Sequence, residues 1–209
     1  MGVRFQTFDD APPLPRVWFL NDSQNELIQI QKDRLSVNWR QGAGAAPYPR
    51  YVHILERFKF ALTVLHEFVE AERLGTVAPN QCEITYVNHI PAEQEWAKLG
   101  DLSRVVTVWQ NRYSDDYLQD PEDVMFAARY RMGNPESPKG RLHITVQPAF
   151  RRSDSMPIFS ITLTARGRPD PGTMNGVFSL LDEQHKWIVC GFTSITTTEL
   201  HRFWGKRNG

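Results

Sequence analysis

Residues 27–40 of this 209-residue chain read LIQIQKDRLSVNWR. Apolar and polar residues alternate on both sides of Lys32-Asp33, and this period of two is typical of β-strands with one buried face. A two-residue turn at Lys32-Asp33 places Ile30 opposite Leu35 on the apolar face. The stretch therefore predicts a β-hairpin, and with it an antiparallel sheet.

The other face of this hairpin carries uncharged polar residues. We call it the amide face, and its members are Gln29, Gln31, Ser36 and Asn38. A face that is open to water would be expected to carry more Lys, Glu and Thr. We therefore expect another protein element to cover the amide face. The chain's own helix and a foreign partner are the two alternatives.

The composition is that of a globular protein without an overall charge. Hydrophobic residues make up 41% of the chain, which suffices for a core in one large domain or in two small halves. Lys plus Arg and Asp plus Glu both number 24, which disfavours nucleic acid as a partner. No apolar run approaches the roughly 18 residues of a membrane span, and the N-terminal residues lack the apolar core of a signal peptide. We expect a cytoplasmic protein that does not contact a membrane.

Familiar enzyme motifs are absent from the sequence. It holds no G-x-S-x-G, no Gly-rich phosphate loop and no H-E-x-x-H. The two cysteines, Cys82 and Cys190, lie too far apart for a Cys-pair zinc site. We predict no catalytic residue, no metal site and no cofactor, and we expect both cysteines to be buried reduced thiols.

Local patterns divide the chain into strands and helices. Residues 1–15 contain three prolines and are expected to form an extended N-terminal segment. Two long helices are expected, one from Pro49 to a C-cap at Gly75 and one over residues 175–192, followed by a short helix capped by Thr196. Residues 101–109 fit either a short helix or a strand. The further predicted strands are Arg16–Leu20, Gln81–Ile90, Val124–Met132, Arg141–Gln147 and Ile158–Arg166.

The order of these elements predicts an α+β fold, in which antiparallel strands curve against two long amphipathic helices. The short connections at residues 134–140 and 151–156 favour an antiparallel meander for the last three strands. We expect a single α+β domain over residues 16–209. Its subdivision into residues 16–99 and 100–209, as two similar halves, is the alternative.

Two groups of residues are candidates for binding. The polar residues of the hairpin and of the strand over residues 81–90 would form one recognition face if these strands are neighbours. These residues are Gln29, Asn38, Arg40, Tyr86 and Asn88. Tyr48, Arg50 and Tyr51 surround Pro49 at the predicted helix start, where free backbone N–H groups attract an anion. Packing of the tyrosines against the helix start is the alternative.

A third group belongs to a hypothesis of another class, an enzyme or small-ligand receptor with a pocket between a curved sheet and a helix. Its polar residues would be His143, Gln147, Arg166 and His201. If the inner face of the meander is instead closely packed with apolar side chains, such a pocket is disfavoured. The apolar residues expected on that face are Phe126, Ile144, Val146, Ile161 and Leu163. Four arginines flank the ends of the meander and offer a phosphate or carboxylate site, although exposed arginines at strand ends are common. They are Arg151, Arg152, Arg166 and Arg168.

Several motifs together resemble a bacterial protein family of sporadic distribution and unassigned activity. They are IQIQKDRLSVNWR, YPRY, CEITYVNHI, LHITVQPAF and FTSITTTELHRFWG, and the resemblance spans the chain from about Pro15 onward. It implies no catalytic residues. Members of that family begin with a further strand and helix, so the resemblance also implies an open sheet edge near the hairpin that a protein partner or a second copy could occupy.

These expectations favour a non-catalytic binding or accessory protein, such as an antitoxin-like or defence-associated interaction module. The enzyme or small-ligand receptor is the alternative.

Overall fold

A computed structural model describes residues 2–6, 16–41, 48–94, 96–110, 114–115, 117–119, 121–170 and 173–205. The chain divides into two compact units, Met1–Val77 and Ala78–Gly209. The alternative expected from the sequence has its boundary between residues 99 and 100. The observed boundary lies earlier because the strand over residues 82–91 pairs with a strand of the second unit.

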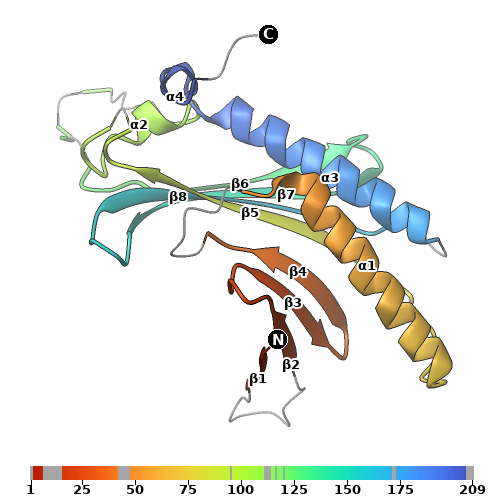
Figure 1. The fold of residues 1–209 in the computed structure, drawn as a ribbon. Helices are drawn as coiled ribbons and strands as arrows, with labels where there is room; N and C mark the ends of the chain where they lie inside the picture. Colours follow the sequence, from red (N-terminus) through yellow and green to blue (C-terminus); the bar gives the residue numbers. More distant parts are fainter. Residues whose placement is uncertain are drawn as a thin grey trace. The chain divides into compact units, whose positions relative to one another are not determined.

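The first unit contains a four-stranded antiparallel sheet, shown in red to orange in Figure 1. Its strands follow the chain in the order β1 (Gly2–Gln6), β2 (Arg16–Leu20), β3 (Glu26–Gln31) and β4 (Arg34–Trp39). The predicted hairpin is confirmed, with Ile30 opposite Leu35 and Gln29 opposite Ser36. Of the N-terminal segment, residues 2–6 form β1, and residues 7–15 lie outside the described part.

The first long helix, α1 (Arg50–Ala71), follows β4. Pro49 occupies its N-cap position, where the missing N–H is not needed. The expected C-cap at Gly75 is wrong, since the helix ends at Ala71 with Glu72 as its C-cap. The backbone N–H of Glu72 bonds to the carbonyl of Phe68, and Arg73 takes a φ of 52°, so the chain leaves the helix before it reaches the glycine.

The second unit is built on another four-stranded antiparallel sheet, in the order β5-β8-β7-β6. The strands are β5 (Cys82–Pro91), β6 (Phe126–Gly133), β7 (Pro138–Phe150) and β8 (Pro157–Gly167). The predicted meander β6-β7-β8 is confirmed. Because β5 hydrogen-bonds to β8 and not to the hairpin, the continuous polar face expected across these strands is wrong.

The second long helix, α3 (Met174–Ile195), packs on one face of this sheet (Figure 1). Gln184 in its middle is fully buried and donates from Nε2 to the carbonyl of Cys82, 3.0 Å away, which ties α3 to β5. Cys82 is buried as expected, whereas Cys190 on α3 is exposed, contrary to expectation. The core beneath α3 includes Leu142, Ile144, Val146, Phe159, Ile161, Leu163, Ala165 and Ile188.

Two short helices, α2 (Leu102–Val105) and α4 (Thr198–Phe203), complete the second unit. The ambiguous segment 101–109 is helical only over α2, after which Val106 is extended and forms an isolated bridge with Thr196. Thr196 is therefore not the cap of α4. Thr197 caps this helix, with its hydroxyl oxygen accepting from the backbone N–H of Leu200. The α+β class with antiparallel sheets is confirmed in both units.

Strands β7 and β8 approach each other closely at one end. Gly140 lies directly opposite Gly167, and a Cβ on Gly140 would lie 2.3 Å from the carbonyl oxygen of Arg166. This end of the sheet requires glycine, because a side chain would push the two strands apart.

Candidate functional site

The face of the second sheet that points away from α3 is polar and basic. Along each strand the residues of this face alternate with buried ones, as Arg141 and His143 alternate with Leu142 and Ile144. We call it the arginine face, after its charged residues Arg129, Arg131, Arg141 and Arg166, which surround His143. All four arginines are exposed, and the histidine is half-buried.

The strand register sets these side chains in two adjacent rows. In the first row Arg131 of β6 lies opposite Arg141 of β7, which lies opposite Arg166 of β8. In the second row Arg129 lies opposite His143. Because neighbouring strands are about 4.8 Å apart and alternate residues of a strand about 7 Å apart, these groups share a small patch of surface.

One carboxylate belongs to this patch. Glu83 of β5 completes the first row and pairs with Arg166, with 2.5 Å between Oε2 and Nε. The other contacts of the row are to backbone, since Arg131 donates to the carbonyl of Pro135 and Arg141 to that of Gly140. Within the described part of the chain, no ion pair joins Arg129, Arg131 or Arg141 to a carboxylate.

His143 lies among these positive charges, opposite Arg129. Partial burial lowers the pKa of its imidazole, and the charges of Arg129 and Arg166 lower it further, while Glu83 acts in the opposite direction. A positively charged imidazole is disfavoured there because it would add a further cation to the patch. Burial is the largest cause of the lowered pKa, and the positive charges of the neighbouring arginines act in the same direction.

The arrangement carries a cost in folding stability. Like charges directly opposite each other in an antiparallel sheet are destabilising, and Arg131 and Arg141 form such a pair. Natural proteins break one or two local rules of this kind at functional sites and compensate for the cost elsewhere in the structure.

A small pocket in the first unit is a second candidate site. It has a volume of about 200 Å³ and lies between the sheet and α1. Its apolar wall comes from Phe19, Ile28 and Val37, which lie opposite one another on β2, β3 and β4. Polar groups of Glu26 and Arg57 lie at the same pocket.

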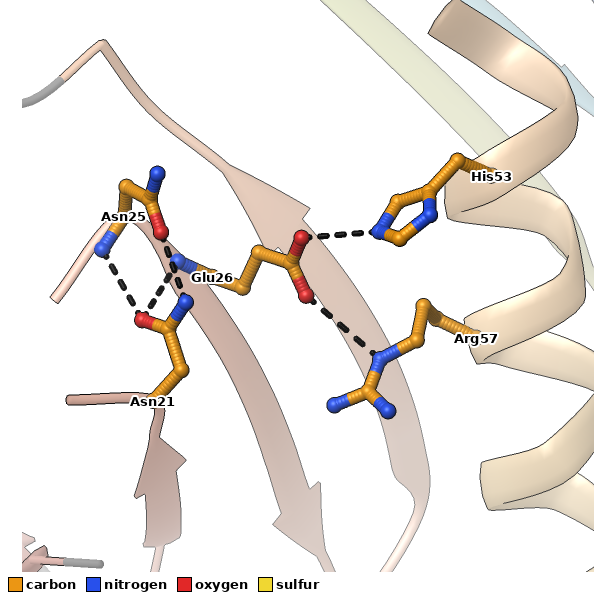
Figure 2. A network of polar contacts seen from close by, with 5 residues as sticks. All are labelled: Asn21, Asn25, Glu26, His53 and Arg57. Atoms are coloured by element: carbon orange, nitrogen blue, oxygen red, sulfur yellow. Dashed lines mark hydrogen bonds and ion pairs between the residues drawn. The ribbon is translucent and has the colours of Figure 1, made fainter. Parts of the chain in front are cut away.

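Figure 2 shows how Glu26 connects β3 to α1. One of its carboxylate oxygens is 2.8 Å from Nε2 of His53, and the other is 3.4 Å from Nε of Arg57. Asn21 holds the start of β3, since its Oδ1 accepts from the backbone N–H groups of Asn25 and Glu26. This network positions Arg57 over the pocket.

The position of α1 bears on the question of the amide face. Glu26 lies on the same side of the sheet as Ile28 and Val37, and α1 contacts that side. The expectation that the chain's own helix covers the amide face is therefore wrong for α1. On the amide face, Gln29 is half-buried and Asn38 is exposed.

The remaining candidates of the first unit lie after β4 and at the start of α1. Arg40 is exposed and donates from Nε to the carbonyl of Gln24. The ring of Tyr48 packs edge-on against Trp39, with 5.2 Å between centroids, which agrees with the alternative that the tyrosines pack at the helix start. Arg50 is exposed with a φ of 61°, and Tyr51 is half-buried.

Tyr86 and Asn88 lie on the α3 side of β5, away from the arginine face. The hydroxyl of Tyr86 lies 3.1 Å from Nδ1 of His185 on α3. Burial lowers the pKa of this histidine. Asn88 is half-buried opposite Ile161.

The third candidate group is divided by the structure. Arg166 and His143 come together on the arginine face, and Gln147 lies on the same face but two rows further along β7. His201 is separate, on α4, with Nε2 2.7 Å from the hydroxyl of Thr196. None of the four lines the pocket of the first unit.

The inner face of the meander is packed. Ile144, Val146, Ile161 and Leu163 are at most 1% exposed, and Phe126 packs against them. These side chains fill the space between the sheet and α3, which removes the main support for an enzyme pocket at that place.

Sequence reasoning missed several residues of both sites. Arg129, Arg131 and Arg141 stand at alternate positions of predicted strands, and this alternation was a signal that they share a face. The pairing of Glu26 with His53 and Arg57 had no such signal. These partners lie 27 and 31 positions further along the chain, and they meet Glu26 only through the packing of α1.

We compared the chain with protein-family models, with curated proteins and with solved structures, and none of the three comparisons found a match. Among the residues that the structure describes, no three His, Cys, Asp or Glu side chains are grouped so that they could hold a metal ion. Likewise, none of the described helices combines the length and the apolar character needed to cross a membrane.

Proposed function

We propose that this chain is a non-catalytic binding protein, an accessory or antitoxin-like interaction module that acts in the cytoplasm. The observation that carries the proposal is the arginine face, where Arg129, Arg131 and Arg141 are exposed without a paired carboxylate in the described chain. Guanidinium groups recognise carboxylates and phosphates through paired hydrogen bonds. The partner is therefore a protein with a negatively charged segment.

The packed interior supports binding over catalysis. Substrate pockets are concave and enclose most of a small ligand, whereas the arginine face is the open side of a sheet whose inner side is filled. Exposed charge arranged on a rigid sheet suits recognition of another macromolecule, since complementary charges steer association and fix the relative orientation of the partners.

Native mass spectrometry tests this proposal. The chain is purified mildly from its own host, in parallel with Arg129→Gln/Arg141→Gln and with the control Arg152→Gln. Arg152 is exposed in the turn after β7, and the structure separates it from Arg166, which lies opposite Arg141 near the other end of that strand. We expect a stoichiometric protein partner on the wild type and the control, and its loss from the double variant. The proposal would be contradicted if no partner is bound in any sample, or if the partner binds the double variant as it binds the wild type.

The second candidate is a small-ligand receptor, and the pocket of the first unit favours it. A volume of about 200 Å³ is below the usual size of ligand pockets but could enclose a small molecule with an apolar body and one anionic group. Arg57 would bind that group. The test is a thermal-shift screen of small carboxylic acids on wild type and Arg57→Gln, in which only the wild type should be stabilised.

Two further expectations are part of the proposal. We infer membership of the sporadically distributed bacterial family from the motifs given above. We also infer that the units are similar halves, because each has a four-stranded antiparallel sheet followed by a 22-residue helix, although the strand orders differ.

A further inference from the structure

The cations of the arginine face are closely spaced. Arg131 and Arg141 are direct cross-strand neighbours, and Arg129 is two residues from Arg131 on the same face of β6. The backbone positions that carry these three arginines are therefore roughly 5 to 8 Å apart. Arg166 adds less positive charge, because Glu83 already pairs with it.

We propose that the arginine face binds a phosphate monoester, presented by a phosphorylated segment of the partner protein. This inference rests on the proposed function and specifies the ligand of the same site. A single carboxylate carries one charge and two oxygens, and it is satisfied by one arginine in a paired contact. A phosphate monoester carries a charge of about −1.5 to −2 at pH 7 and three acceptor oxygens, which matches a site with three cations.

Hydroxyl groups next to the arginines extend the match. In the second row His143 lies opposite Thr164, which lies opposite Thr85. The hydroxyl oxygens of the two threonines are 2.9 Å apart. Neutral donors of this kind complement charged ones around phosphate oxygens.

Nucleic acid fits this surface less well. Proteins that bind single strands stack bases on aromatic side chains. The next row of the face holds Ala127, Thr145, Thr162 and Val87, so His143 is the one aromatic ring that these rows offer for stacking, and it is half-buried. The zero net charge of the chain also provides no extended positive field for a long polyanion.

His143 provides an internal probe of the site. Three of the arginines that act on its pKa, Arg129, Arg166 and Arg141, belong to the arginine face, and Glu83 is the acidic group that acts on it. A bound phosphate would offset the arginine charges, so the pKa of His143 should rise when the site is filled.

The experiment uses the full chain and three synthetic peptides that differ only at one central residue, which is phosphoserine, glutamate or serine. Calorimetry measures affinity, and NMR follows the titration of the His143 imidazole with and without peptide. We expect the phosphoserine peptide to bind at least tenfold more tightly than the glutamate peptide and to raise the pKa of His143. Arg141→Gln should lose at least tenfold in affinity, and the control Arg152→Gln should not.

The other outcomes separate the two proposals. Equal binding of the glutamate and phosphoserine peptides would overturn the phosphate inference and leave the proposed binding function intact. If free phosphoserine binds as tightly as the phosphoserine peptide, the assignment of the phosphate to a segment of a partner protein is overturned. If an eight-residue oligothymidylate competes with the peptide at the same site, the exclusion of nucleic acid is overturned. If no peptide binds and the pKa of His143 does not change, the inference is overturned altogether.

Discussion

Replacement of Arg141 by Gln should stabilise this protein while it weakens binding at the arginine face. Arg141 lies between Arg131 on one neighbouring strand and Arg166 on the other, so it has two like charges directly opposite. The substitution keeps a polar but shorter side chain, and it removes the charge together with the hydrogen bond to the carbonyl of Gly140. The dependence of its effect on salt therefore measures the electrostatic cost of the site.

The expected size of the effect follows from the register. A like-charge pair opposite each other costs on the order of 0.2–1 kcal/mol. Glu83 pairs with Arg166, so most of the relief comes from the single neighbour Arg131. We expect the free energy of unfolding to rise by about 0.5 kcal/mol at low salt, which is about 1–2 °C in melting temperature for a chain of this length.

Urea unfolding followed by circular dichroism measures the change at 0.05 M and 1 M NaCl. At 1 M salt the screening length of about 3 Å is shorter than the strand spacing, so the gain of Arg141→Gln should disappear. Arg152→Gln serves as the control and should show no gain at either salt concentration. A destabilised Arg141→Gln at low salt, or a gain that survives 1 M NaCl, would refute the reasoning.

Three further predictions concern the free energy of unfolding of the second unit, measured by urea titration. Leu163→Ala should lower the free energy of unfolding by about 2–5 kcal/mol, because Leu163 is fully buried. The control Val87→Ala, at a residue that is 58% exposed, should change it by less than about 0.5 kcal/mol. Equal losses in the two variants would contradict the packed interior. Thr197→Ala should cost about 1 kcal/mol through loss of the α4 cap, and Thr198→Ala should cost clearly less if Thr197 is the cap. Burial raises the pKa of Cys82 to about 11, so the unfolded thiol ionises first and stability should fall between about pH 9 and pH 11. Cys82→Ala should lack this part of the pH dependence, and an unchanged profile would contradict the buried thiol.

The local elements were predictable because their signals are local. The hairpin register over residues 27–40 follows from period-two alternation and a two-residue turn, and the structure has the same partners. The meander was predictable for a similar reason, since short connections leave few topologies open. The caps were less predictable: Thr196 and Thr197 have the same side chain, and only the bridge from Val106 to Thr196 decides which one precedes α4.

The candidate sites depended on contacts between distant parts of the sequence. His143 and Arg166 were named from the sequence as polar groups of one pocket between a sheet and a helix, and their association with Arg129 and Arg141 on an exposed face required the pairing of three strands. The polar face expected between β5 and the hairpin failed for the same reason, because no local pattern states which strands become neighbours.

The sequence by itself thus determined the strands from β2 onward, the long helices and the faces on which their residues lie, since these follow from backbone periodicity and the burial of apolar side chains. Only the tertiary structure decided that β5 pairs with β8, that α1 covers the side of the first sheet opposite the amide face, and that arginines from three strands gather around one histidine. The physical reason is that strand pairing and helix docking are chosen by the fit of whole surfaces, which residues far apart in the chain build together.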